Sequence, residues 1–317
     1  MYLYLICFVT GLALPSLARY VVSKLHRDGK AELYDQADAV TLNLTRGNSL
    51  WFNMGWWSQE AKEEDFHEAA AALCRKVALA AGLDSNQRIC EVGYGSGDST
   101  LLLQREFSPK TYIGFTSLAA QHKIASQRMQ GFASDNIDVR QGDAATALQG
   151  LAPESLDAVI AVDCAFHFNP RQAFFVDAAT TLQPEGRIAL TDLLLPSTRL
   201  SLLDSLFLRT ICLLAKLPFE NLQTRTSYAQ SLVEAGFEES SIEMLDISEH
   251  VWPGFLRFVE RRERELGPVL GSAWKGLNMY ASVVRWYSGI GGGKQRLRFY
   301  LISAKKGKGT SGSKKLY

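Results

Sequence analysis

The sequence predicts an α/β fold, a doubly wound and mostly parallel sheet of seven strands with helices on both faces. Between residues 88 and 192, strand-like and helix-like segments alternate five times. The strand-like segments are nearly continuous apolar runs, which is typical of parallel strands covered on both faces. A glycine-rich turn directly follows the first of these runs. These observations together favour an open sheet that binds its ligand at the carboxyl ends of its strands.

Each predicted element has a local sequence signal. The strands are short runs of apolar and β-branched residues, namely 88–92, 111–115, 137–140, 156–163, 186–192, 242–247 and 298–304. The helices between them follow a helical spacing of apolar residues, namely a helix that starts at 99, then 121–130, 171–182 and 228–235. A long helical stretch rich in aromatic residues precedes the last strand. Seven strands and their covering helices fit one domain.

Composition limits the classes of function. The 317 residues are 47% hydrophobic, which is ample for a core, and the net charge of +1 gives no field that suggests nucleic acid. The five cysteines are odd in number and lack C-x-x-C spacing, so we expect reduced, structural thiols. The five histidines form no pair at ligand spacing, so no metal is expected.

The most informative segment is the turn after the first strand. Gly93, Gly95 and Gly97 allow backbone conformations that other residues avoid, and they let a ligand lie against main-chain N–H groups. The dinucleotide fingerprint needs its third glycine at position 98, which is Asp98 here. Glu91 at the strand tip repels phosphate but suits an ammonium or sulfonium group. The turn therefore favours a cationic cofactor such as S-adenosylmethionine.

Polar residues follow three further strands of the predicted sheet. Thr116, Asp143 and Asp163 each stand where a strand ends, so we expect them to surround the same crevice as Glu91.

From these motifs, roughly residues 30–305 resemble the class I S-adenosylmethionine-dependent methyltransferases. Residues 91–97 are similar to the family's first motif, which wraps the methionine part of the cofactor. The segment 142–144 resembles the one that binds adenine. This implies that the Asp143 side chain and the backbone N–H of Ala144 contact the adenine amino group and ring. The turn 182–187 resembles the L-x-P-G-G turn of the family, with Glu185 in place of a glycine.

The end of the second strand departs from many members of the family, which carry a ribose-binding acid there. Here Gly114, Thr116 and Gln121 match the pattern G-x-T-x-S-x-x-Q of the sterol, cyclopropane and small-molecule branch, with the serine one residue early at Ser117. The resemblance implies that Thr116 and Gln121 contact the cofactor.

An aromatic segment upstream resembles the amino-terminal arm of that branch. Tyr34 and the stretch 50–57, which includes Trp56, correspond to the part that closes over the cofactor. Aromatic faces attract cations, which suits a sulfonium ligand. The resemblance thus implies that Tyr34 and Trp56 belong to the cofactor site, and the position of Asp163 at a strand end places it in the same site.

The candidate for chemistry is His167, just after the fourth strand. Methyl transfer needs an aligned nucleophile and removal of its proton, and a histidine titrates near neutral pH. A packing or substrate-binding role for His167 remains open. We expect O-methylation of a small, apolar or lipid-like acceptor in secondary metabolism. C-methylation of a sterol or prenyl acceptor, a non-catalytic scaffold and an NAD-dependent reductase are the alternatives.

Residues 2–22 are almost wholly apolar, with Arg19 as their only charge, and as a helix they would span a hydrocarbon core of about 30 Å. Basic residues follow this run, so the positive-inside rule leaves the catalytic domain in the cytosol, and we expect the endoplasmic reticulum membrane.

The expected domains are a membrane anchor at 1–22, an arm at 23–70, a methyltransferase domain at 71–305 and a disordered basic tail at 306–317. The insertion 195–225 contains the apolar stretch 200–217, which suits a lid over the substrate crevice, a helix on the membrane surface or a helix packed on the core.

Overall fold

The computed structural model describes residues 42–43, 48–58, 65–131, 136–197, 200–270 and 272–307, without the side chains of 266–276. These residues belong to one compact unit, residues 36–317. The predicted anchor at 1–22, Tyr34 and most of the predicted tail lie outside the described residues. Among the residues that the structure describes, no helix is both long and apolar enough to cross a bilayer.

The core of the fold is a seven-stranded sheet in the order β3-β2-β1-β4-β5-β7-β6. β7 runs antiparallel to both neighbours, and the other pairs are parallel. The strands are β1 (Arg88–Val92), β2 (Thr111–Thr116), β3 (Ile137–Gln141), β4 (Leu156–Ala161), β5 (Leu182–Leu194), β6 (Glu243–Asp246) and β7 (Arg298–Lys305). The predicted mostly parallel sheet is confirmed, because each predicted strand is present close to its expected bounds.

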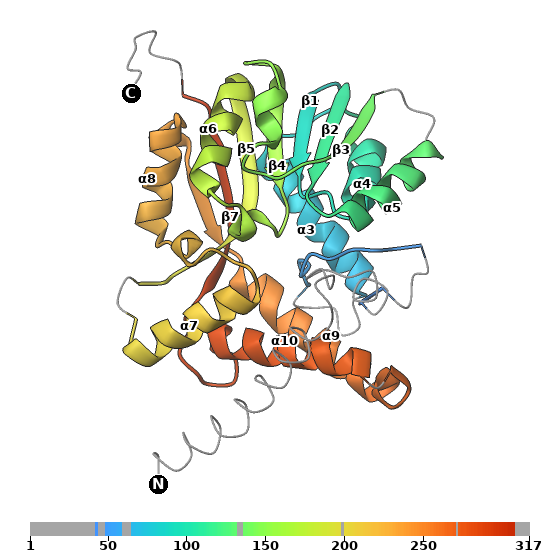
Figure 1. Cartoon of the computed structure of the whole chain (residues 1–317), viewed down its shortest axis with the longest axis vertical. Coiled ribbons are helices and arrows are strands. Elements are labelled where there is room, and N and C mark those ends of the chain that lie inside the picture. The colour runs from blue at the N-terminus through green and yellow to red at the C-terminus, as the bar shows by residue number, and fades with distance from the viewer. Residues whose placement is uncertain are drawn as a thin grey trace. The chain divides into compact units, whose positions relative to one another are not determined.

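Helices cover both faces of this sheet (Figure 1). The α-helices are α3 (Phe66–Ala80), α4 (Asp98–Phe107), α5 (Ala119–Gln130), α6 (Arg171–Thr181), α7 (Leu202–Leu214), α8 (Arg225–Ala235), α9 (Ser248–Leu270) and α10 (Ser272–Ser288). Short 3₁₀ helices are η1 (Ala147–Gly150), η2 (Ala165–His167), η3 (Phe219–Asn221) and η4 (Glu239–Ser241). The predicted boundary at residues 70 and 71 falls inside α3, and α7 lies within the predicted insertion.

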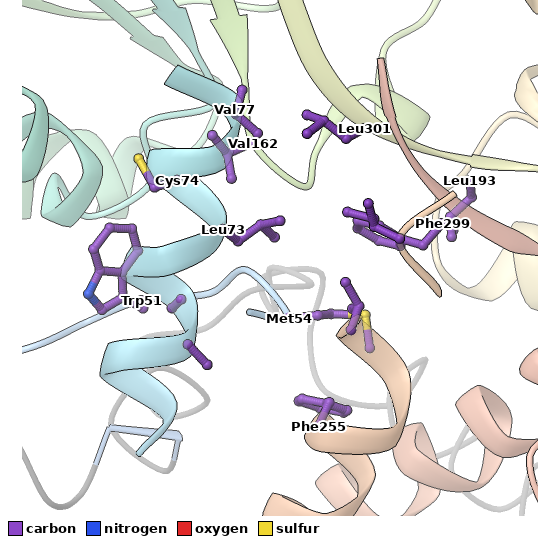
Figure 2. Close-up of a cluster of buried hydrophobic side chains, with 14 of the residues drawn as sticks. Trp51, Met54, Leu73, Cys74, Val77, Val162, Leu193, Phe255, Phe299 and Leu301 are labelled. Atoms are coloured by element: carbon purple, nitrogen blue, oxygen red, sulfur yellow. The ribbon is translucent and has the colours of Figure 1, made fainter. Parts of the chain in front are cut away.

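The two faces of the sheet pack against two separate hydrophobic clusters. One cluster joins α6 and α8 to the sheet through residues such as Phe174 and Tyr228. The other joins α3, α9 and α10 to the opposite face and includes Trp51 and Met54 of the segment before α3 (Figure 2). Alternate residues of β1 explain the division, since Ile89 belongs to the second cluster and Cys90 to the first. The segment before α3 is therefore part of the core.

β5 begins earlier than the sequence predicts. Leu182 already pairs with Leu156, and the ladder then shifts register before Ala158 pairs with Arg187. Glu185, which replaces a glycine of the family turn, has a φ of 66° in the left-handed region. The predicted turn 182–187 thus lies inside β5, where it coincides with an irregularity of the ladder.

Trp57 packs closely against α9 at Gly254. A Cβ at Gly254 would overlap the Cβ and Cγ atoms of Trp57. The Trp57 indole is held in place, since its Nε1 donates a hydrogen bond to Met54 O at 2.7 Å. Ala normally favours a helix over Gly by about 1 kcal/mol, but overpacking costs about 1–3 kcal/mol. We therefore expect Gly254→Ala to lower the free energy of unfolding.

Urea unfolding followed by circular dichroism measures this effect. Gly150→Ala is the matched control, because a Cβ there meets nothing within 4 Å. An unchanged or higher midpoint for Gly254→Ala would contradict the packing argument.

Candidate active site

Loops that follow the parallel strands meet at one edge of the sheet. Gly93 N, after β1, donates a hydrogen bond to Phe115 O of β2 at 2.7 Å. Gly142 N, after β3, donates to Thr116 O at 2.9 Å. The loops after β1 and β3 are therefore both hydrogen-bonded to the carboxyl end of β2.

The glycine turn borders open space. Gly93, Gly95 and Gly97 have φ values of 95°, 60° and 91°, a region that residues with side chains rarely adopt. A Cβ at Gly93 would overlap the Sγ of Cys164, so the turn lies against the loop after β4. A Cβ at Gly95 would meet nothing within 4 Å. A ligand can thus approach the backbone at Gly95, as the sequence motif requires.

Glu91 is fully buried in β1, next to this turn. Its Oε2 accepts a hydrogen bond from the Tyr112 hydroxyl at 2.6 Å, and that hydroxyl also contacts Thr100 Oγ1 at 2.8 Å. Within the described ranges, Glu91 Oε1 has no hydrogen-bond partner. Burial raises the pKa of Glu91 from 4.5 to about 7. A cationic ligand nearby would favour the ionised form of this carboxyl.

The residues expected to hold ribose and adenine lie around the next two strand ends. Thr116 Oγ1 donates to Gln121 Oε1 at 3.0 Å, and both side chains are buried. Asp143 is exposed, and its Oδ1 accepts from Ala145 N at 2.9 Å, which shapes the turn after β3. Ala144 is buried beside it. Polar groups at this end could accept from hydroxyl and amino groups of a nucleoside.

Asp163 lies where β4 ends and binds the segment before α3. Its Oδ2 accepts from Met54 N at 2.7 Å, and its own N–H donates to Thr191 Oγ1 at 2.8 Å. Burial raises the pKa of Asp163 from 3.8 to about 7. A second carboxyl with a raised pKa therefore lies at the carboxyl ends of the strands. The same carboxyl also holds the backbone of Met54 in place.

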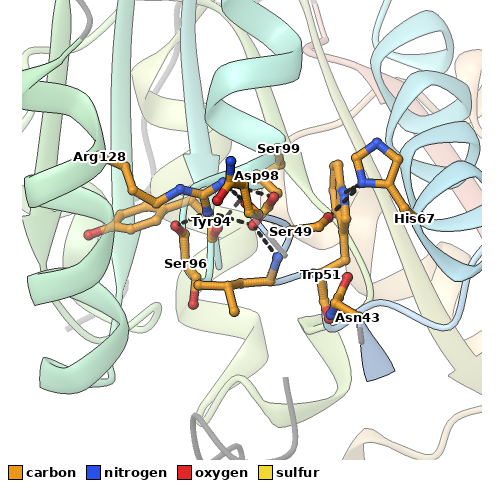
Figure 3. A network of polar contacts seen from close by, with 11 residues as sticks. Asn43, Ser49, Trp51, His67, Tyr94, Ser96, Asp98, Ser99 and Arg128 are labelled. Atoms are coloured by element: carbon orange, nitrogen blue, oxygen red, sulfur yellow. Dashed lines mark hydrogen bonds and ion pairs between the residues drawn. The ribbon is translucent and has the colours of Figure 1, made fainter. Parts of the chain in front are cut away.

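A polar network holds residues 48–50 against the glycine turn (Figure 3). Arg128 of α5 forms an ion pair with Asp98, with an Nη1–Oδ2 distance of 2.6 Å. Asp98 Oδ2 also accepts from Leu50 N at 3.2 Å, while Arg128 donates to Ser96 O and Asn48 O. Asp98, at the position where a dinucleotide motif has glycine, thus joins three separate segments. The sequence shows Asp98 next to the glycine turn, but it does not predict the ion pair with Arg128.

Of the two aromatic residues predicted to close over the cofactor, Trp56 is described by the structure. The Trp56 ring stacks on His250 of α9 with centroids 4.0 Å apart, and the Lys76 ammonium lies 4.8 Å from its centroid. Its described ring contacts are thus with α9 and α3. Tyr34 lies outside the described residues.

His167 ends the short helix η2 after β4. Its Nδ1 lies 3.4 Å from Lys216 O, just after α7. Asn221 Nδ2 donates to the carbonyl oxygens of Phe166 and Phe168 at 3.0 and 2.8 Å, so η3 fixes the backbone on both sides of the histidine. Burial lowers the pKa of His167 below its ordinary value of 6.5. The imidazole is therefore neutral and oriented at neutral pH.

The donor set fits S-adenosylmethionine. The open backbone at Gly95 provides space, and Glu91 provides a buried carboxyl with an unpartnered oxygen. Thr116 and Asp143 provide polar groups at the adjacent strand ends. The described residues hold no cluster of three or more His, Cys, Asp or Glu side chains that could bind a metal ion.

Known proteins share this architecture. The erythromycin 3''-O-methyltransferase of Saccharopolyspora erythraea is 27% identical over 217 residues, which cover 67% of this chain and 69% of that enzyme. Phosphoethanolamine N-methyltransferase 2 of Haemonchus contortus, solved with S-adenosyl-L-methionine, superposes with a TM-score of 0.68 at 17% identity, covering 88% of this chain and 61% of that one. The cyclopropane synthase MmaA2 of Mycobacterium tuberculosis gives a TM-score of 0.66 at 15% identity, covering 86% and 94%.

The two solved structures show that the fold is shared. A family model described as a methyltransferase domain matches residues 66–241, from α3 to η4, which is more than half of the chain. This match favours methyl transfer over the NAD-dependent reductase that the sequence left open. The chain belongs to this methyltransferase-domain family and is an S-adenosylmethionine-dependent methyltransferase.

Proposed function

We propose that the chain methylates an oxygen atom of a small, apolar or lipid-like molecule of secondary metabolism. The observation that carries this proposal is the neutral, oriented His167 in the loop after β4, which lies against the glycine turn at Gly93 and Cys164. When bound, S-adenosylmethionine supplies an electrophilic methyl group on its sulfonium. The protein then has to align an acceptor oxygen and take its proton.

The contact of His167 with Lys216 O supports one ring nitrogen as the base in this proposal. Lys216 O can only accept a hydrogen bond, so the 3.4 Å contact makes Nδ1 the donor. In the neutral ring the lone pair is then on Nε2. Because burial lowers the pKa of His167, this nitrogen is unprotonated at neutral pH and can accept a proton from a hydroxyl group.

The surroundings of His167 support an apolar acceptor. The Phe166 ring centroid lies 4.6 Å from the histidine ring, and α7 contributes the buried side chains Leu208 and Cys212 to the same cluster as Phe166. The relative from S. erythraea is named as an O-methyltransferase, which supports oxygen as the target. C-methylation is less well supported, because the one acid directly after β4, Asp163, is bound to Met54 N.

We also propose that residues 2–22 anchor the chain in a membrane, with the catalytic domain in the cytosol. The apolar run and the basic residues that follow it support this proposal. Carbonate-washed membranes should retain the full-length chain, and release into the supernatant would contradict an anchor.

Product analysis tests the proposed reaction. Cell extract incubated with the enzyme and methyl-labelled cofactor, followed by untargeted mass spectrometry, should give a labelled product of low polarity. Nuclear magnetic resonance of that product should place the labelled carbon on oxygen. A methyl group bound to carbon would contradict O-methylation.

His167→Ala should lower turnover by about 10²–10⁴ fold, the usual contribution of a positioned base, with near-normal cofactor affinity. The pKa of His167 is lowered, so the wild-type rate should rise with pH below 6.5, where the ring loses its proton. This rise should be absent in the variant.

His167→Asn is the matched control, because its amide can still donate to Lys216 O but cannot act as a base. If His167 has only a packing or positioning role, the asparagine variant should recover turnover and the wild-type pH profile. Such recovery would contradict the assignment of His167 as the base.

A further inference from the structure

Helix α7 exposes four leucines on one side. Leu202, Leu203, Leu206 and Leu213 have exposed fractions of 91%, 75%, 65% and 79%. At 100° per residue these leucines lie within an arc of about 100° on one side of the helix. Scattered apolar residues on a surface are ordinary, but four leucines on one face of a 13-residue helix form a patch that requires a partner.

The opposite face of α7 fixes this orientation. Asp204, Leu208 and Cys212 are buried at a spacing of four residues. Asp204 Oδ1 accepts from Arg296 Nε at 2.6 Å, and Asp204 also pairs with Lys294 at 3.2 Å. The helix is therefore held on the segment before β7 with its leucines turned outward.

Basic groups flank the leucine face. Arg209 is exposed on α7, with its guanidinium 4.0 Å from the centroid of the Phe219 ring, and Lys216 is exposed just after the helix. Lys294, whose side chain is 55% exposed, lies at the first turn through its contact with Asp204. Asp204, the acid on the helix, pairs with both Lys294 and Arg296, so these three groups carry a net charge of +1. An apolar stripe with a cationic margin suits the surface of an anionic membrane.

We propose that α7 docks the enzyme on an anionic lipid bilayer, with its four exposed leucines inserted among the acyl chains. A protein partner is less suitable, because leucine is under-represented among the residues that dominate protein interfaces. The apolar residues 2–22 independently indicate that the chain works at a membrane.

This placement has a consequence for the acceptor, which rests on the proposed function. The end of α7 leads to Lys216, whose carbonyl contacts His167. Docking of α7 would therefore bring the acceptor side of the site close to the bilayer. A lipid-like acceptor could then pass from the membrane to His167 without crossing water.

Hydrogen exchange of the full-length chain tests the docking. Peptides covering 202–214 should exchange more slowly after addition of phosphatidylcholine vesicles that contain phosphatidylserine. The variant Leu203→Ser/Leu206→Ser/Leu213→Ser should lose this protection about tenfold or more, because the inserted apolar area is removed. Leu79→Ser is the matched control, since Leu79 is 62% exposed but lies on α3.

Binding of S-adenosylhomocysteine to the triple variant should match the wild type, which separates docking from the cofactor site and from misfolding. Vesicle binding that leaves 202–214 unprotected would overturn the proposal, because another segment would then carry it. Protection of 202–214 without vesicles would also overturn it: dependence on protein concentration would indicate a second copy, and independence another part of the chain.

Discussion

Two carboxyl groups with little access to water, the buried Glu91 in β1 and the half-buried Asp163 after β4, are the constraint on which the site depends. Glu91 and Asp163 both have pKa values raised to about 7. A carboxyl whose pKa is raised by folding stabilises the fold at low pH, and this contribution is lost as pH rises through about 7. Near neutral pH the cofactor-free protein therefore holds acids that a cationic ligand would stabilise in ionised form. The site is arranged for a positive charge.

The segment before α3 connects this electrostatic site to the fold. Met54 N binds Asp163, Leu50 N binds Asp98, and Trp57 packs against Gly254 of α9. These contacts join residues more than forty positions apart in the sequence. The segment before α3 can therefore take its place beside the site only when the sheet and α9 have both formed. Helix α7 likewise joins separate parts of the chain, since Asp204 on its buried face pairs with Arg296 before β7, and Lys216, just after the helix, contacts His167.

The sheet and the glycine turn could be predicted because their signals are local. Apolar runs give the strands, and the spacing of Gly93, Gly95 and Gly97 requires a left-handed turn. The ion pair of Asp98 with Arg128 and the contact of His167 with Lys216 O could not be predicted, because these partners carry no local signal and reach the site only through tertiary packing. Trp56 illustrates the same limit, since an aromatic motif indicates a buried or ligand-facing ring but does not indicate His250 as its neighbour.

The central claim is that a cationic cofactor binds beside buried acids at the glycine turn. Calorimetric titration of S-adenosylmethionine between pH 5.5 and 8.5 tests it most directly, with the wild type compared to Glu91→Gln. The wild-type affinity should rise by up to about tenfold per pH unit towards pH 7, because binding to a protonated carboxyl must displace a proton. Glu91→Gln should bind more weakly at pH 8 by about 1–3 kcal/mol and lose a large part of this pH dependence. Equal affinity and an identical pH profile in the two proteins would contradict the account.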